Sequence, residues 1–217
     1  MKELLIKEIR LASSPLSYIF LLASLMTLLP GYPILMSAFF ICFGIFHSFQ
    51  NSREANDTVF SVLLPIRKSD FVRAKFAFTA LIQLAGFVLS AVLTVVRMTA
   101  LSGFTPYLTN KLLNATPYYL AFVLLIFAAF NVFFLGGFFK TGYKFGLPFL
   151  LFIIASFVLI AIAETLPHLP ELEFLSVPSG EKLGIQFLIL AVSAVLFAAV
   201  TLLSCKKSIS RFERIDL

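Results

Sequence analysis

The sequence predicts an all-α integral membrane protein with six transmembrane helices, and three observations lead to this fold class. Hydrophobic residues make up 60% of the 217-residue chain and charged residues only 13%, whereas a soluble domain has roughly 45–50% apolar and about 25% charged residues. The charges gather between uncharged runs that each supply the roughly 20 residues needed to cross a bilayer. One run, residues 11–52, has double length and is interrupted by Pro30, Gly31 and Pro33, which end a helix and turn the chain.

Six expected spans follow when the double run is divided into a helical hairpin and each other run is taken as one helix. A membrane β-barrel is disfavoured, because no stretch alternates apolar and polar residues over the length of a barrel strand. We expect the spans at residues 15–29, 34–51, 76–97, 117–138, 146–163 and 184–204.

Residues 2–12, before the first expected span, have the pattern of a short amphipathic helix. Its apolar side chains fall on one stripe, at Leu5, Ile6, Ile9 and Ala12. A Ser-Ser-Pro sequence then breaks the helix. Such a segment lies in the membrane interface with its basic residues toward the headgroups. It is either a simple anchor or an elbow that also frames a docking surface for a partner.

The connection between the second and third spans, residues 52–75, is the longest polar segment of the chain. Residues 53–63 are expected to form a short helix that ends before Pro65, and Ser69 or Asp70 can cap the next helix. The segment mixes charges with apolar residues, so its helix has an apolar face that needs something to pack against. This face either packs on the bundle or receives a cytosolic partner.

The distribution of Lys and Arg predicts that both termini are cytoplasmic. Of the 17 cations, only Arg97, Lys111 and Lys182 fall outside when the N-terminus is placed inside, which is the bias of the positive-inside rule. The net charge of +6 is then explained by the membrane, through contact with anionic lipid headgroups, and requires no nucleic acid. The inner cations are Lys2, Lys7, Arg10, Arg53, Arg67, Lys68, Arg73, Lys75, Lys140, Lys144, Lys206, Lys207, Arg211 and Arg214.

The sequence carries little that predicts catalysis or a resident metal. No acidic residue lies in the middle of a span, and His47 and His168 fall in separate compartments. Cys42 and Cys205 lie near the reducing side, so no disulfide is expected. The Lys-Thr pair at 140–141 lacks the glycine that a phosphate-binding loop places before its lysine. We therefore expect no catalytic site and no cofactor in this chain, and any ATP must be bound by another polypeptide.

Four polar side chains fall inside the expected spans. They either form interhelical hydrogen bonds, which stabilise by about a kcal/mol or less each, or they line a translocation path. These residues are Gln83, Ser90, Thr94 and Asn131.

A motif after the second span resembles a known family. It comprises Glu54, Asn56, Asp57, a Leu-Pro-Ile sequence at 64–66, two basic residues at 67–68, Asp70 and Lys75. Together with the amphipathic start, the six spans and the length, this pattern is similar to the ABC-2 permeases of ATP-binding-cassette exporters. It resembles in particular the compact six-span bacterial permeases that include the phenol-soluble-modulin exporter of staphylococci.

The resemblance implies that residues 1–217 form one permease domain of the bacterial plasma membrane. A second permease copy, in a homodimer, and a cytosolic ABC ATPase that binds ATP and Mg would be its partners, in a two-plus-two assembly. The cargo would be amphipathic or hydrophobic, such as cytolytic peptides. Residues 53–64 would be the coupling helix that contacts the ATPase. The coupling residues would be Arg53, Glu54, Asp57, Thr58, Phe60, Leu64 and Pro65.

One departure and one alternative accompany the resemblance. Larger members of the class carry outer re-entrant helices between the last two spans, whereas residues 164–182 are short and interrupted by prolines. A substrate-capture membrane subunit of a vitamin importer would have a similar length and number of spans. It would need a polar pocket toward the outside, and Gln83 and Asn131 are the sparse polar residues that favour one.

Overall fold

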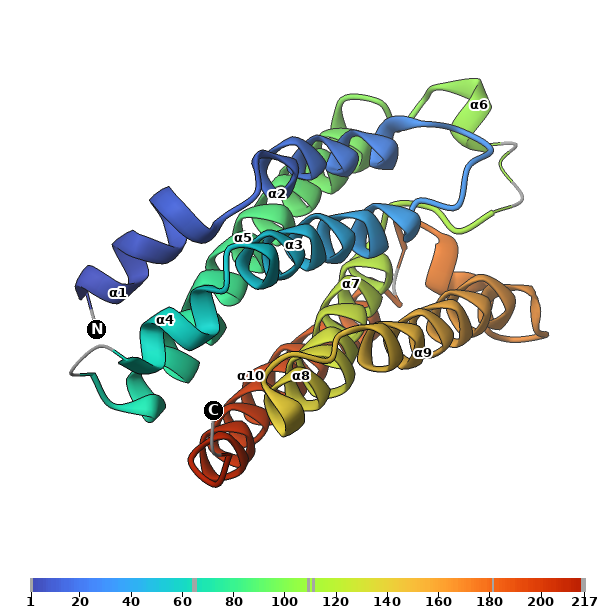
Figure 1. The fold of residues 1–217 in the computed structure, drawn as a ribbon. Helices are drawn as coiled ribbons and strands as arrows, with labels where there is room; N and C mark the ends of the chain where they lie inside the picture. The colour runs from blue at the N-terminus through green and yellow to red at the C-terminus, as the bar shows by residue number, and fades with distance from the viewer. Residues whose placement is uncertain (1, 64–65, 109, 111, 181, 216–217) are drawn as a thin grey trace.

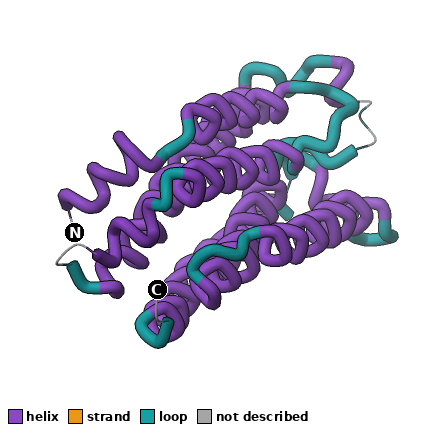
Figure 2. Tube along the Cα trace, in the orientation of Figure 1, coloured by secondary structure: helices purple, strands orange, loops and turns teal. Residues whose placement is uncertain are grey.

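The computed structural model describes residues 2–63, 66–108, 110, 112–180 and 182–215. In these residues the chain is helical and contains no strand (Figure 2). The long helices lie side by side, and the connections gather at the two ends of the bundle (Figure 1). One end carries the N-terminus, α4, the turn after α8 and the C-terminus (Figure 1). We call it the basic end, because most of the cations lie there.

The first segment consists of two helical parts that meet at a sharp bend of 94°. Ser14 caps the second part by accepting a hydrogen bond from the Leu16 amide, and Pro15 occupies its first turn, where no amide hydrogen is needed. The first helical part covers residues 2–12, and its position in the membrane interface stays a prediction. The elements are α1 (Lys2–Lys7), the π-helix η1 (Glu8–Ala12), α2 (Pro15–Ile19) and the 3₁₀-helix η2 (Phe20–Leu28).

The next helix, α3 (Met36–Glu54), continues further than the sequence predicted. It includes Arg53 and Glu54, which we had expected to begin the following short helix. The chain turns at Asn56, whose φ of 52° is a left-handed conformation that Asn adopts more easily than most residues. The short helix α4 (Asp57–Leu63) starts directly after this turn.

The central and C-terminal helices occupy the remaining expected ranges, with short additional turns between them. Thr116 caps α7 by accepting a hydrogen bond from the Tyr119 amide, and Gly142 ends α8 in a left-handed conformation with φ of 78°. The elements are α5 (Lys68–Thr99), α6 (Thr105–Leu108), α7 (Pro117–Ala129), the π-helix η3 (Phe130–Leu135), α8 (Gly136–Thr141), α9 (Gly146–Thr165), the 3₁₀-helices η4 (Leu166–His168) and η5 (Glu173–Ser176), and α10 (Leu183–Phe212).

Within the described residues, four helical stretches are long and apolar enough to cross a membrane, so the chain is a multi-pass membrane protein. The bent pair at the N-terminus raises the number to five if it counts as one span. Polar residues in the last third of α3, such as His47 and Gln50, lower its hydropathy. Six spans therefore stay a prediction. The four stretches are Lys68–Thr99, Pro117–Thr141, Gly146–His168 and Leu183–Phe212.

Phenylalanine side chains fill the space between α3, the α7–η3–α8 stretch and α9. Phe46 stacks on Phe149 with ring centroids 3.8 Å apart, and Phe49 meets Phe134 and Phe138 edge to face at 5.2 and 5.1 Å. Most of α7 is buried by its neighbours, whereas α10 packs on α7 with one face and leaves most of its surface exposed. The packed phenylalanine rings thus hold α3, the α7–η3–α8 stretch and α9 against one another.

Candidate functional site at the basic end

Four charged side chains from three separate segments meet inside the basic end. Lys7 and Glu8 come from the junction of α1 and η1, Asp57 from the first turn of α4, and Lys75 from α5. We call these four residues the charge cluster. The three segments lie far apart in the sequence, so only the tertiary fold brings them together.

Lys75 is the centre of the charge cluster. Its ammonium group lies 2.6 Å from a Glu8 carboxylate oxygen and 3.1 Å from a carboxylate oxygen of Asp57. Lys7 lies 2.5 Å from the other Asp57 oxygen and 3.4 Å from Glu8. Two cations and two anions therefore alternate, and each charge has an opposite partner.

Hydroxyl groups and aromatic rings complete the surroundings of the charges. The Ser52 hydroxyl, at the end of α3, donates to Asp57 at 2.8 Å and accepts from Lys75. The Phe71 ring lies below both ammonium groups, at 5.4 Å from Lys7 and 5.5 Å from Lys75. Glu8 and Lys75 are almost fully buried, at 2% and 3% exposed. Such a network is costly to bury but strongly destabilising to break on one side.

The charge cluster sets the ionisation of Asp57. Burial alone would raise the pKa of this carboxyl group, but the Lys75 and Lys7 ammonium groups and the Ser52 hydroxyl outweigh it and hold the pKa below its ordinary value. Asp57 is therefore ionised at neutral pH, and α4 is fixed to α1 and α5 by charge-assisted hydrogen bonds.

The two faces of α4 differ sharply. Thr58 and Ser61 point into the protein and are 8% and 1% exposed. Val59, Phe60 and Leu63 point outward and are 47%, 60% and 80% exposed. Ser61 accepts a hydrogen bond from Lys7 at 2.8 Å, which ties the inner face to the first helix. The outer face of α4, meaning Val59, Phe60 and Leu63, is an apolar surface beside a charged anchor.

The turn after α8 extends this outer surface. Tyr143 is 54% exposed and lies with Gly142 across a small hollow from Asn56 and Val59. The guanidinium group of Arg53 stacks 4.6 Å above the Phe145 ring, which joins the end of α3 to this turn. Two segments that are distant in the sequence therefore share one exposed face.

The structure divides the predicted coupling residues into two groups. Glu54 and Phe60 are exposed, and Arg53 is exposed beside Phe145. Asp57 instead faces the bundle and anchors α4 through its ion pairs, and Thr58 is 8% exposed. Leu64 and Pro65 lie outside the described residues.

The predicted in-span polar residues are all buried within the chain. The amides of Gln83 and Asn131 exchange two hydrogen bonds of 3.0 and 3.1 Å between α5 and η3. Asn131 also donates to Thr201 of α10 at 2.9 Å. Thr94 donates to the Ser90 carbonyl oxygen at 2.8 Å within α5. Interhelical hydrogen bonding thus accounts for the contacts of Gln83 and Asn131, and a role of the four residues in a translocation path stays a prediction.

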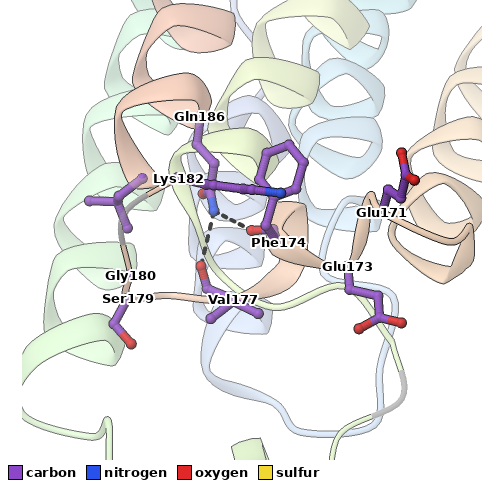
Figure 3. Close-up of a pocket in the computed structure, with 9 residues that line it drawn as sticks. Glu171, Glu173, Phe174, Val177, Ser179, Gly180, Lys182 and Gln186 are labelled. Atoms are coloured by element: carbon purple, nitrogen blue, oxygen red, sulfur yellow. Dashed lines mark hydrogen bonds between the residues drawn. The ribbon is translucent and has the colours of Figure 1, made fainter.

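The opposite end holds a second buried cation and a surface pocket. Arg97 donates to the Thr27 carbonyl oxygen at 2.7 Å and to Asn114 at 3.0 Å, so it fastens α5 to η2 and to the segment before α7. The connection between α9 and α10 folds into the 3₁₀ turns η4 and η5 in its described part. Gln186 donates to the carbonyl oxygens of Phe174 and Val177 and holds this connection against α10 (Figure 3).

That connection lines an open pocket of about 400 Å³ (Figure 3). The Lys182 ammonium group lies 4.8 Å above the Phe174 ring. The side chains of Glu171 and Glu173 lie to the right of the Phe174 ring in this view (Figure 3). Lys182 and Gln186 thus contact residues of the connection itself. The described residues contain no group of three His, Cys, Asp or Glu placed to bind a metal.

Sequence reasoning missed Lys7, Glu8, Ser52 and Lys75 as members of a site. The signal at Glu8 is its position, three residues after Leu5 and four before Ala12, which places a carboxylate next to the apolar stripe of an amphipathic helix. Lys75 directly precedes a long apolar run, and its partners could not be identified from that position alone.

The chain matches a known protein family over nearly its whole length. Residues 3–213 match the model of a family described as ABC-2 family transporter protein. No curated protein and no solved structure matches the chain. The match covers nearly the whole chain, including α1, α4 and the charge cluster.

Proposed function

This chain belongs to the ABC-2 family of transporter proteins, and we propose that it is the membrane-spanning subunit of an ATP-driven exporter. The proposed cargo is amphipathic or hydrophobic, with cytolytic peptides as the first class to test. One observation carries the proposal: α4 has an exposed apolar outer face and an inner face that is ion-paired to α1 and α5. A helix built in this way can be moved by a partner and can transmit the movement to the bundle.

The proposed orientation places the basic end in the cytoplasm of a bacterial cell. The bias of Lys and Arg toward this end supports it, and both termini then lie inside. In this orientation α3 and the helix formed by α2 and η2 are the two additional spans of a six-span protein. The 94° bend before Pro15 leaves α1 and η1 in the plane of the interface.

The proposed assembly has two copies of this chain and two cytosolic ATPase subunits. ATP and Mg²⁺ are bound by the ATPase, which docks on the outer face of α4 and on Tyr143. Closure of the ATPase pair would displace α4, and the charge cluster would pass this displacement to α1 and α5. Gln83 and Asn131 would become part of a cargo path only when α5 and η3 separate, because in the present arrangement the two amides bind each other.

Co-purification with the cognate ATPase tests the proposal. Phe60→Ala removes an exposed ring from the outer face of α4, and Glu54→Lys reverses an exposed charge beside it. Each variant should lower ATPase retention and transport, and the double variant should lower both at least tenfold. The thermal stability of the permease should be unchanged. Phe104→Ala, which removes a ring that is 50% exposed at the opposite end, is the matched control. Equal retention of the ATPase by the Phe60 and Phe104 variants would overturn the docking role of α4.

A further inference from the structure

A groove opens on the side of the bundle between η3, α8, α9 and α10, and no residue of the charge cluster lines it. Its volume is about 440 Å³. Its walls are mostly apolar, and two cations stand where it approaches the basic end. The lining residues are Val132, Phe133, Gly136, Gly137, Leu151, Val200, Leu203, Ser204, Lys207 and Arg211.

Two adjacent glycines make room for this groove. Gly136 and Gly137 begin α8, directly after the π-helix. A Cβ atom on Gly137 would lie 2.8 Å from the Pro148 side chain, and one on Gly136 would lie 3.4 Å from the Ser204 hydroxyl. The backbone of α8 can therefore approach α9 and α10 closely and leave a surface recess beside Phe133.

The groove side of α10 changes from apolar to cationic along one stripe. Val200, Ser204, Lys207 and Arg211 follow one another at intervals of three or four residues, and Leu203 lies four residues before Lys207, so the five share one helix face. The apolar members precede the cations, which lie at the basic end. A molecule that follows this stripe would contact hydrocarbon first and positive charge at its end.

The two cations differ in how they are held. Arg211 donates to the Gly136 carbonyl oxygen at 3.1 Å, so its guanidinium group is fixed over the groove. Lys207 is exposed, and no ion pair joins it to another residue in the described part of the chain. Its ammonium group is thus available to an anion beside a guanidinium group that is already in place.

We propose that this groove binds one anionic phospholipid of the cytosolic leaflet. The lipid phosphate pairs with Lys207 and Arg211, and an acyl chain lies against Leu203, Val132 and Phe133. The inference rests on the proposed orientation, which places these cations at the headgroup level, where basic pockets between helices bind anionic headgroups. Charge complementarity at one end and apolar walls along the rest select a lipid over a soluble anion.

Native mass spectrometry of the full-length protein tests whether the two cations bind the lipid headgroup. The protein is purified in detergent with equal amounts of phosphatidylglycerol and phosphatidylethanolamine, and the lipids retained per chain are counted. We expect one retained phosphatidylglycerol. Lys207→Gln should weaken its binding about fivefold, as expected for one cation near an anionic headgroup. Lys206→Gln, which removes a neighbouring exposed cation outside the groove, should leave binding unchanged.

A second pair of variants tests whether an acyl chain lies against the groove wall. Leu203→Gln places an amide in the groove wall, whereas Leu202→Gln makes the same change at a residue that is 72% exposed and lies outside the groove. Retention should fall for the Leu203 variant alone. Thermal unfolding of all four variants shows whether any of them fails to fold.

Three results would overturn the proposal. These are equal retention of both lipids by the wild type, equal effects of Lys206→Gln and Lys207→Gln, or equal effects of the two leucine variants. Each would mean that a diffuse cationic surface or general detergent exchange explains the bound lipid. The readout contains no ATPase, so failure of this inference and failure of the proposed coupling are separate results.

Discussion

The Lys75 ammonium group lies 2.6 Å from a carboxylate oxygen of Glu8, and both side chains are buried. This ion pair connects α5 to the helix at the start of the chain. Asp57 joins the same ammonium group at 3.1 Å, so α4 shares the connection. The helix α4, which we propose to contact the ATPase, is therefore fixed to α5 through Lys75 and to α1 through Lys7.

Replacing Lys75 should be strongly destabilising. Lys75→Met leaves the carboxylates of Glu8 and Asp57 buried beside an apolar side chain, and breaking a buried ion pair on one side costs about 3–5 kcal/mol. The melting temperature of the detergent-solubilised protein should fall accordingly. Arg73→Met is the matched control on α5, because its side chain is 55% exposed and its contact with Asp70 is long at 3.6 Å. Equal losses for the two variants would contradict the central position of Lys75.

The contribution of Asp57 to stability should depend on pH only under acidic conditions. Its pKa is lowered in the folded protein, so its ionised form stabilises the fold above the ordinary value of 3.8, and this stabilisation is lost as the pH falls through the lowered pKa. The difference in melting temperature between wild type and Asp57→Asn should be constant from about pH 5 to about pH 8 and shrink below about pH 4. A transition near neutral pH would contradict this ionisation.

Gln83 and Asn131 should be energetically coupled. Each single change to Leu leaves the other amide buried without its partner, so the double variant should cost less than the two single costs together. Pairs of this kind in membrane proteins are coupled by about 0.6 kcal/mol on average and at most about 1.7 kcal/mol. Asn131→Leu should cost more than Gln83→Leu, because Asn131 also binds Thr201 at 2.9 Å, whereas the further bond of Gln83, to the Phe127 carbonyl oxygen, is long at 3.4 Å. A double-mutant cycle of unfolding in detergent would measure this coupling, and a value of zero would refute it.

Gly44 should be intolerant of any side chain. A Cβ atom there would lie 2.9 Å from the Phe20 Cβ and 3.1 Å from the Leu16 carbonyl oxygen, so α2 and η2 would have to move away from α3. Ser17, which donates to the Gly44 carbonyl oxygen at 2.7 Å, would lose this bond. We expect Gly44→Ala to destabilise by about 1–3 kcal/mol.

Gly184 provides the control for that substitution. It lies in α10 with open space around its Cα, so Gly184→Ala should cause no loss of stability. Thermal unfolding of the two variants side by side distinguishes close helix packing from a general effect of replacing glycine.

Much of the helical layout could be predicted from hydropathy, because long apolar runs have few alternatives to helices in lipid. The range 146–163 corresponds to α9, which begins at Gly146 and ends at Thr165. The ends were predicted less well, since polar residues such as Glu54 continue a helix beyond its apolar part. The range 184–204 underestimates α10, which extends to Phe212 for the same reason.

The charge cluster could not be predicted from the sequence, because its members are related only by folding. The sequence places Lys75 among the inner cations and in the motif that resembles the ABC-2 permeases, but nothing near it in the sequence identifies Glu8 as its partner. The resemblance implies that Asp57 contacts the ATPase, whereas in the structure its carboxylate faces Lys7 and Lys75. The period of α4 would have allowed either face to point inward, and only the positions of Lys7 and Lys75 decide between them.

The order in which the chain is synthesised gives the sharp bend between α1 and α2 a further consequence. Glu8 leaves the ribosome long before Lys75, so the ion pair between them cannot form until residue 75 has been translated. In the proposed orientation, the first helix stays at the water-facing surface of the bilayer during that interval, and Glu8 has no contact with α5. We therefore expect residues 2–12 to be cleaved by protease more readily in a ribosome-bound chain arrested before residue 75 than in the full chain.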